Sequence, residues 1–314
     1  MKFPLLIPKF YANLIDWKDQ KDPLMRMVVP SSFEDSAKEY EMADPIGDKP
    51  KTVIAGLIHR YPDRVLVNLT SACAVHCRFC FRKNLLCENE NVVKPDVGKI
   101  LSYMRDHKEI WEVIFSGGDP FMLKAEFLKE IIGKISKISH IKTIRFHSRI
   151  PVVDARLITG KLLAALKTSK KLVIVVHINH PREISKEFQK VVQKFQKIGA
   201  LIMSQTVLLK GVNDDTEILS ELFRELVVTG VKPYYLHHLD AAKGTHHFRI
   251  SIEKGKKIFQ SLRGNLSSIC LPEYVVDIPG GFGKIPVNSL KKIGPKTYTA
   301  KNFENKTIKY VDHI

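Results

Sequence analysis

Three of the five cysteines in this 314-residue chain stand close together, as Cys73, Cys77 and Cys80 in the run CAVHCRFC. Thiolates at this spacing fit a tight loop around one [4Fe-4S] cubane, and three of them leave its fourth iron open to bind a substrate or cofactor. A structural zinc ion normally takes four ligands in two separated pairs, and no second pair follows at that spacing. The spacing therefore favours a cluster with an open iron over a zinc site or three core cysteines. Cys87 and Cys270 have no thiol at ligand spacing and are expected to be structural.

A second group of candidate residues is the run SGGD, which contains Ser116, Gly117, Gly118 and Asp119. It follows an apolar run, so it is expected to close a strand. Two glycines let a backbone approach a ligand closely, and a carboxylate can accept hydrogen bonds from an ammonium group. On its own the run is equally compatible with an ordinary strand-to-loop turn.

Five further polar residues have both a functional and a structural interpretation. His177 and Gln205 end predicted strands, where ligand groups of α/β barrels gather, although each could simply satisfy backbone groups. Lys284 follows the glycine-rich turn of PGGFGK; a lysine that acts as a nucleophile must be neutral, whereas most lysines here belong to the surface. Asp240 and Asp277 are helix caps or ion-pair partners, or they converge on one pocket and hold a cation, because buried carboxylates are costly unless paired.

The elements that position these residues follow from hydrophobic periodicity. Short apolar or β-branched runs alternate with stretches of helical period, which predicts right-handed βαβ crossovers. The predicted strands are 65–70, 113–118, 143–148, 172–178, 201–209 and 232–239. The predicted helices include 127–138, 157–169, 188–199, 217–230 and 251–265. Six such strands predict an α/β fold, a partial (β/α)6 TIM-type barrel of parallel strands, with its ligand groups at the carboxyl ends of the strands.

The chain is expected to form one catalytic domain, because its 44% apolar composition can bury a single large core. Residues 1–60 carry prolines among short helical patterns and are predicted to be an irregular, partly helical N-terminal extension packed on the core. The barrel is expected to span residues 61–290, where YVVDIPGGFGKIPV returns apolar chain to the core. Residues 291–314 are expected to be a polar C-terminal tail.

The net charge of +17 would suit an acidic partner, such as nucleic acid or an anionic protein. Nucleic-acid binding is disfavoured, because many lysines fall on the wet faces of amphipathic helices and no RRM, zinc-finger or basic-zipper pattern is present. No run approaches 18 apolar residues, and Pro4 and Pro8 interrupt the first apolar stretch, so neither a membrane span nor a secretion signal is expected. Cysteines clustered at metal-ligand spacing indicate a reducing, cytoplasmic compartment.

From about Asp22 to Val287 the chain resembles lysine 2,3-aminomutase and its relatives among the radical S-adenosylmethionine enzymes. The runs that carry the resemblance are YPDRVLVNLTSACAVHCRFCFRK, EVIFSGGDP, RFHSRIPVV, HINHPRE, SQTVLLKGVND, PYYLHHLD and VVDIPGGFGKIPV. The resemblance implies a [4Fe-4S] cluster, S-adenosylmethionine and pyridoxal 5′-phosphate as cofactors. It also implies an isomerase that moves the amino group of L-lysine from Cα to Cβ and that takes electrons from a reductant such as flavodoxin or ferredoxin.

The resemblance assigns cofactor roles residue by residue. The cluster would be held by Cys73, Cys77 and Cys80. Pyridoxal phosphate would be bound by Lys284, with Tyr61 and Arg64 around it. S-adenosylmethionine would be lined by Ser116, Gly117, Gly118, Asp119, His177 and Gln205.

Three further residues match those that hold the substrate in this family. Arg82 matches the arginine that binds the α-carboxylate by bidentate contact. Asp240 and Asp277 match the carboxylates that hold the ε-ammonium of lysine. The acidic pair favours lysine over glutamate, because relatives that act on acidic substrates lack it.

Two departures bear on the branch of the family. The cysteine-bearing C-terminal region of the longer enzymes, which binds zinc and helps them dimerise, is not seen, so no zinc is expected. His237 stands where those enzymes have a tyrosine beside the coenzyme. The short enzymes that supply β-lysine to elongation factor P share both features, whereas VVDIPGGFGK matches the longer ones.

Several alternatives stay open at this point. The chain could serve elongation factor P alone, or it could act on another amino acid. It could also be a radical enzyme without pyridoxal phosphate, or a non-catalytic, RNA-associated binding protein. The resemblance allows a homo-oligomer.

Overall fold

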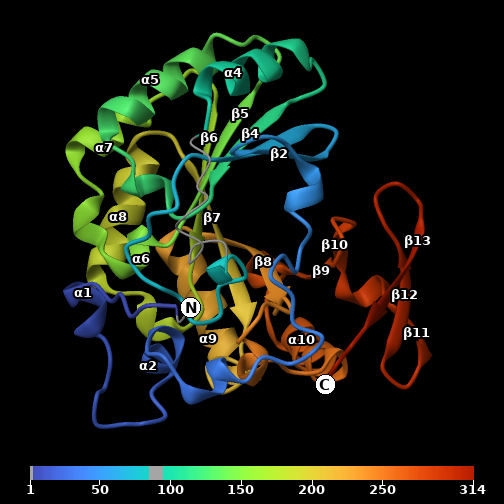
Figure 1. The fold of residues 1–314 in the computed structure, drawn as a ribbon. Coiled ribbons are helices and arrows are strands. Elements are labelled where there is room, and N and C mark those ends of the chain that lie inside the picture. Colours follow the sequence, from blue (N-terminus) through green and yellow to red (C-terminus); the bar gives the residue numbers. More distant parts are fainter. Residues whose placement is uncertain (1–2, 85–94) are drawn as a thin grey trace.

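The core of the molecule is one curved sheet with helices on its outer side (Figure 1). The computed structural model describes residues 3–84 and 95–314. The sheet has ten strands in the order β1 to β10, and those from β3 to β9 are mutually parallel. These parallel strands are β3 (Arg64–Asn68), β4 (Glu112–Ser116), β5 (Thr143–Ser148), β6 (Lys171–His177), β7 (Leu201–Leu208), β8 (Lys232–His238) and β9 (Glu273–Ile278).

Antiparallel strands extend the sheet at both edges. At one edge are β1 (Thr52–Ile54) and β2 (Leu57–Tyr61), and at the other is β10 (Gly283–Pro286). A separate three-stranded antiparallel sheet comprises β11 (Lys291–Gly294), β12 (Thr297–Lys301) and β13 (Thr307–Val311). It stands beside β10 and is coloured red in Figure 1.

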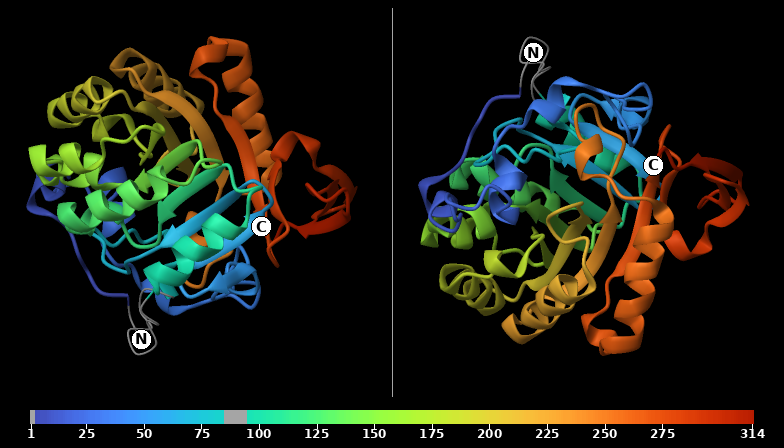
Figure 2. Two further views of the ribbon diagram at one scale, coloured as in Figure 1. Left: turned by 90° about the horizontal axis from the view of Figure 1, so that it is seen from above. Right: turned by 90° about the horizontal axis from the view of Figure 1, so that it is seen from below.

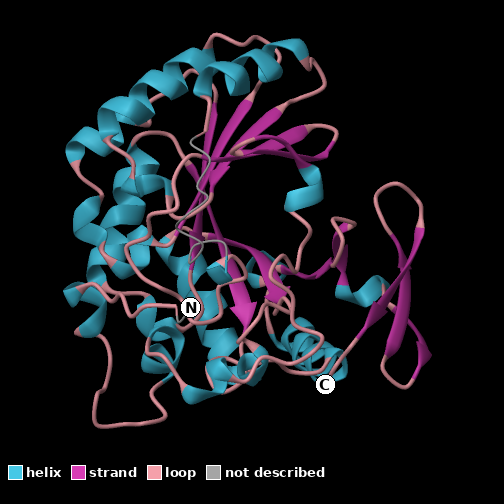
Figure 3. Cartoon of the chain, viewed as in Figure 1, coloured by secondary structure: helices cyan, strands magenta, loops and turns pink. Residues whose placement is uncertain are grey.

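Helices connect the parallel strands and pack on the convex side of the sheet (Figure 2, Figure 3). The connecting helices are α4 (Val97–Asp106), α5 (Ala125–Ser136), α6 (Ile150–Val153), α7 (Gly160–Ala165), α8 (Lys186–Lys197), α9 (Thr216–Thr229) and α10 (Ile252–Asn265). Two short helices, α1 (Lys9–Ala12) and α2 (Pro23–Val28), precede the sheet. No helix among residues 3–84 and 95–314 is long and apolar enough to cross a membrane.

Local sequence explains where the main helices begin and which face they bury. The side chains of Ser185, Asp215 and Ser251 cap α8, α9 and α10 by accepting hydrogen bonds from backbone N–H groups of the first turn. In α8, Phe188 and Phe195 are buried against the sheet while the lysines between them face outward. Strand β4 is buried along its whole length, as expected for a parallel strand covered on both faces.

The structure confirms the six predicted strands and the β/α alternation, and it adds a seventh parallel strand, β9, in the segment that was expected only to return to the core. The N-terminal extension is less irregular than predicted, because β1 and β2 lie within or next to residues 1–60 and belong to the main sheet. The polar tail is also more regular than predicted: alternating apolar residues such as Tyr298 and Tyr310 are buried, so the segment forms a small sheet.

Candidate active site

A cavity of about 690 Å³ occupies the interior of the curved sheet. Several of its polar residues lie at or just after the carboxyl ends of parallel strands, which meet at one edge of the barrel. Every residue predicted to bind a cofactor, a metal or the substrate lines this one cavity: Tyr61, Arg64, Cys73, Cys77, Cys80, Arg82, Ser116, Gly117, Gly118, Asp119, His177, Gln205, Asp240, Asp277 and Lys284. Residues from seven strands, β2, β3, β4, β6, β7, β9 and β10, and from the loops after β3, β4 and β8 are therefore brought together.

The three clustered thiols lie in the loop that follows β3. Burial and the two neighbouring thiols raise the pKa of Cys73, and burial followed by Cys77 raises the pKa of Cys80 to about 11. The thiols thus lie close enough to oppose one another's ionisation, and a cationic cluster would stabilise their thiolate forms. Within residues 3–84 and 95–314, no three His, Cys, Asp or Glu side chains are placed to hold a single metal ion. In a [4Fe-4S] cubane each cysteine ligand binds a different iron, so three thiolates would leave the fourth iron open.

Contacts from the N-terminal extension hold the cysteine loop in place. Arg78 is 2% exposed and donates to both carboxylate oxygens of Glu34, at 2.8 and 2.5 Å. Backbone N–H groups of His76 and Arg78 donate to the carbonyl oxygens of Leu6 and Met27, at 3.0 and 2.8 Å. Residues far apart in sequence therefore fix the cysteine loop. Of the two remaining cysteines, Cys270 lies in the hydrophobic core, and Cys87 lies outside the described residues.

The glycines of the SGGD run pack against the start of the cysteine loop. Gly117 has φ +110°, and a Cβ on Gly118 would lie 2.3 Å from the carbonyl oxygen of Ala72. The backbone N–H of Gly118 donates to the carbonyl oxygen of Thr70 at 2.8 Å. The two glycines thus permit close contact between two loops of the site as well as access for a ligand, since both line the cavity.

The carboxylate of Asp119 has several internal donors. It accepts from the Ser148 hydroxyl at 2.8 and 3.0 Å and from the backbone N–H groups of Arg149, Ile150 and Phe121 at 2.8, 3.2 and 3.0 Å. Asp119 therefore fixes the loop after β4 to the start of α6. Its direct hydrogen bond to a ligand ammonium stays a prediction.

His177 and Gln205 lie opposite each other in the β6–β7 pair. Burial and then Arg149 hold the pKa of His177 well below its usual range, so its ring is neutral. Its Nε2 atom is buried and has no partner among the described residues, and the same holds for Nε2 of His147 in the same cavity. Buried polar atoms are normally hydrogen-bonded, so these two orphaned nitrogens suit a polar ligand such as S-adenosylmethionine.

Lys284 and Asp277 lie directly opposite each other in the β9–β10 pair. Lys284 Nζ is 3.0 Å from Asp277 Oδ2 and 3.2 Å from Oδ1. Although burial opposes both charges, the pair lowers the pKa of Asp277 and raises that of Lys284. Lys284 is therefore an ammonium here, and it must lose a proton and leave Asp277 before it can act as a nucleophile.

The backbone around Lys284 fits a coenzyme site. The backbone N–H of Lys284 donates to the Tyr61 hydroxyl at 2.8 Å. Gly283 has φ +89°, and a Cβ on it would lie 2.7 Å from the same hydroxyl. Only glycine therefore lets this strand approach Tyr61. His237 lies next to Asp277, and burial together with Lys284 lowers the pKa of His237 to about 4, so its ring is neutral.

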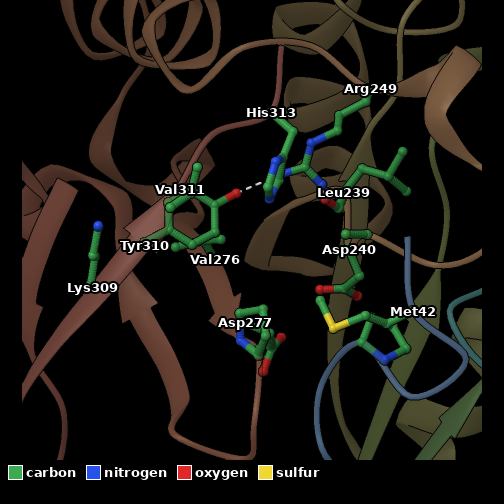
Figure 4. Close-up of a pocket in the computed structure, with 13 residues that line it drawn as sticks. Met42, Leu239, Asp240, Arg249, Val276, Asp277, Lys309, Tyr310, Val311 and His313 are labelled. Atoms are coloured by element: carbon green, nitrogen blue, oxygen red, sulfur yellow. Dashed lines mark hydrogen bonds between the residues drawn. The ribbon is translucent and has the colours of Figure 1, made fainter. Parts of the chain in front are cut away.

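Asp240 supplies a second carboxylate beside Asp277. No described residue donates a hydrogen bond to the Asp240 side chain, whereas Ala242 and Thr245 donate to its backbone carbonyl oxygen. Burial and the charge of Asp277 raise the pKa of Asp240 to about 8. Figure 4 shows the two carboxylates in a smaller pocket of about 270 Å³, which shares Leu239, Asp240 and Asp277 with the main cavity. A cation placed between these carboxylates would relieve their repulsion.

Arg82 is held by an aspartate that sequence reasoning did not identify. Asp48 accepts from Nε and Nη2 of Arg82 at 3.1 and 2.8 Å, and from Nη2 of Arg60 at 2.7 Å. Ser116 Oγ accepts from Nη1 of Arg82 at 3.1 Å. A guanidinium has five N–H donors, so these three bonds leave two for a ligand carboxylate. Asp48 lies in the supposedly irregular extension, and its spacing in the sequence carried no signal.

Arg64 and Phe303 line the cavity beside Tyr61. The Arg64 guanidinium lies 3.9 Å from the centroid of the Tyr61 ring and pairs with Asp63 at 2.7 Å. That pair is partly exposed, so it contributes little and leaves Arg64 available to a phosphate. Phe303, between β12 and β13, packs on Tyr61 with ring centroids 4.9 Å apart. The predicted tail thus supplies a cavity residue that its composition did not reveal.

Comparison with known proteins agrees with this geometry. The fold and the thiol-bearing cavity define a radical SAM protein, and residues 67–223 match the family model described as Radical SAM superfamily. The crystal structure of Streptococcus suis SuiB aligns with a TM-score of 0.51 and 14% identity, over 71% of this chain and 51% of that chain, which supports the fold alone.

Curated relatives define the family more narrowly. The L-lysine 2,3-aminomutase of Methanococcus maripaludis is 41% identical over 314 residues, which cover 99% of this chain and 72% of that protein. The L-lysine 2,3-aminomutase of Clostridium subterminale is 35% identical over 99% of this chain and 75% of its own length. The chain belongs to the lysine 2,3-aminomutase family.

Proposed function

We propose that this protein is an L-lysine 2,3-aminomutase, which converts L-lysine to β-lysine. The observation that carries the proposal is the position of Asp240 and Asp277 beside Lys284, in the same cavity as the three clustered thiols. When bound, the cluster with S-adenosylmethionine supplies one-electron chemistry at an unactivated C–H bond, and pyridoxal phosphate supplies the carbonyl chemistry that carries a migrating amine.

The residues of the chain would bind and orient lysine by its two ends. Arg82, fixed by Asp48, has two free N–H donors for the α-carboxylate. Asp277 already holds an alkylammonium, that of Lys284, and Asp240 offers a second carboxylate to such a group. The contact between Lys284 and Asp277 therefore illustrates how the site would hold the ε-ammonium of the substrate.

The two aspartates are expected to select lysine. Replacing both, as Asp240→Asn with Asp277→Asn, should lower kcat/KM for lysine by more than about a hundredfold, since removing a buried charge pair costs about 3 kcal/mol or more. The wild type should reject glutamate, which would bring a third carboxylate to the acidic pair. Anaerobic turnover with dithionite, followed by mass spectrometry of the β-amino acid, measures both.

The matched control is Asp106→Asn, which changes an exposed aspartate on α4. Its kcat/KM should equal that of the wild type. Equal rates with glutamate and lysine in the wild type, or unchanged lysine turnover in the double variant, would show that the aspartates do not select the substrate.

The state of Asp240 predicts a pH dependence. Because its pKa is raised to about 8, Asp240 is mostly protonated at neutral pH, and only its ionised form attracts the ε-ammonium. We expect kcat/KM for lysine to rise with pH, by up to tenfold per unit, and to level off above about pH 8. In Asp240→Asn this rise should disappear; a rise of the same slope and midpoint in the variant would assign it to another group.

Asp48 is expected to act through Arg82. Asp48→Asn keeps the size of the side chain but removes the charge that fixes both guanidiniums, so Arg82 should lose its orientation. We expect KM for lysine to rise about tenfold, with a smaller change in kcat, as for loss of a ground-state contact. Steady-state kinetics with lysine test this, and an unchanged KM in a folded variant would refute it.

Partners and pathway belong to the same proposal. The reaction needs one electron from outside, and a net charge of +17 suits an anionic electron-transfer protein such as a flavodoxin or ferredoxin. We propose a reducing, cytoplasmic setting for the thiols and the cluster. His237 matches the branch of the family that supplies β-lysine to elongation factor P, whereas VVDIPGGFGK matches the longer enzymes. Detection of β-lysine on that factor in cells that contain the enzyme would test this link.

A further inference from the structure

We propose that Arg149 is a positioning residue for the cluster ligand Cys77, and that its guanidinium helps to set the reduction potential of the cluster. Arg149 directly follows β5, and its side chain is 6% exposed. Nη1 of Arg149 lies 2.7 Å from Sγ of Cys77 and donates to it. This inference rests on the proposed role of the three thiols as cluster ligands.

Buried partners hold the guanidinium in place. Nη2 of Arg149 donates to Glu183 Oε1 at 2.9 Å and to the Tyr11 hydroxyl at 3.3 Å, and it also approaches the Met27 sulfur at 3.7 Å. The guanidinium also lies over the ring of Phe79, 5.2 Å from its centroid. Arg149 therefore cannot turn away from the sulfur without leaving its carboxylate.

The carboxylate of Glu183 is itself fully buried and fixed. It accepts from the Tyr11 hydroxyl at 2.8 Å and from the backbone N–H groups of Asn179 and His180 at 2.6 and 3.1 Å. Because a buried ion is costly unless paired, Arg149 and Glu183 stay together. Tyr11 belongs to α1, so the network also ties the N-terminal extension to the cysteine loop.

This arrangement is specific to one of the three thiols. Among the described residues, Cys77 is the cysteine whose sulfur accepts a hydrogen bond from a side chain. Hydrogen bonds to cluster sulfurs and nearby positive charge favour the reduced, more negative cluster and so raise its potential. Arg149 should thus make the first electron transfer easier, without touching the substrate.

The test compares reconstituted clusters by redox titration followed by electron paramagnetic resonance. The test variant is Arg149→Gln with Glu183→Gln, which removes both charges and leaves neither unpaired. We expect the wild-type iron content with a more negative midpoint potential. The matched control is Arg145→Gln with Glu112→Gln, which removes another buried pair, 2.6 Å apart, whose Arg145 lines the same cavity, and it should shift the potential less.

Arg149→Lys provides a second reading if the double variant does not fold. A lysine keeps the positive charge but cannot donate to both Cys77 and Glu183 in the way a guanidinium does. The midpoint potential of the cluster in this variant should therefore fall between those of the wild type and the double variant. A potential equal to that of the wild type in whichever of these variants folds would overturn the proposal. Failure of the wild type itself to form a [4Fe-4S] cluster would instead refute the proposed function.

Discussion

Replacing any one of Cys73, Cys77 and Cys80 with alanine should remove both the cluster and all turnover. Three thiolates on a four-iron cubane leave one iron open, and the three cysteines lie in one loop that lines the cavity. Iron and acid-labile sulfide, measured after anaerobic reconstitution, should fall to the level of unbound background. Turnover of lysine should become undetectable, because the electron has no route to S-adenosylmethionine.

Cys270→Ala is the control for this experiment. Cys270 is 7% exposed and packs in the hydrophobic core, so its loss should reduce stability slightly and leave the iron content intact. An unchanged iron content in Cys77→Ala would refute the assignment of the ligands. So would loss of the cluster in Cys270→Ala while the protein stays folded.

Replacing Lys284 with alanine should abolish covalent binding of pyridoxal phosphate and, with it, turnover. Lys284 faces the cavity from β10, and Gly283 lets its backbone approach Tyr61. Borohydride treatment of the wild type followed by peptide mapping should place a pyridoxyl group on Lys284. Binding of S-adenosylmethionine should change little in the variant, because the thiols and the SGGD loop belong to other strands.

The pH dependence of this labelling adds a second check. Asp277 raises the pKa of Lys284, so labelling should increase with pH in the wild type. In Asp277→Asn the lysine loses its stabilising partner, and labelling should extend to lower pH. A label on another lysine, such as the exposed Lys99, or normal turnover by Lys284→Ala, would contradict the assignment.

Much of the fold could be predicted, because parallel strands buried on both faces leave a clear pattern. The run VIFSGG forms most of β4 and the turn after it. The predicted strand 143–148 has the same bounds as β5 in the structure. The β/α alternation then places the polar strand ends in one cavity. The cavity residues on these strands were identified because the same residues carry the family motifs.

The contributions of the two terminal segments could not be predicted. Asp48 and Glu34 act through residues more than 30 positions away, on Arg82 and Arg78, and no periodic pattern signals such contacts. In the sequence, Phe303 belongs to a segment predicted to be a polar tail. In the structure, the connection between β12 and β13 places it against Tyr61. Long-range ion pairs and packing depend on tertiary structure, which hydrophobic periodicity does not report.

The carboxylate of Asp119 illustrates a different limit. Its residue type suggested contact with a ligand ammonium, whereas the structure gives it donors from the Ser148 hydroxyl and from the backbone of the next loop. A carboxylate after a strand can serve either purpose, and only the geometry of the neighbouring loop separates them.

The central claim is that one cavity binds lysine, both cofactors and the cluster, and moves the α-amino group within the molecule. The most direct measurement is anaerobic incubation of the reconstituted protein with S-adenosylmethionine, pyridoxal phosphate, dithionite and L-lysine labelled with ¹⁵N at the α-nitrogen. The account predicts β-lysine that carries the ¹⁵N on Cβ. Unchanged lysine, or β-lysine whose Cβ nitrogen is unlabelled, would contradict it.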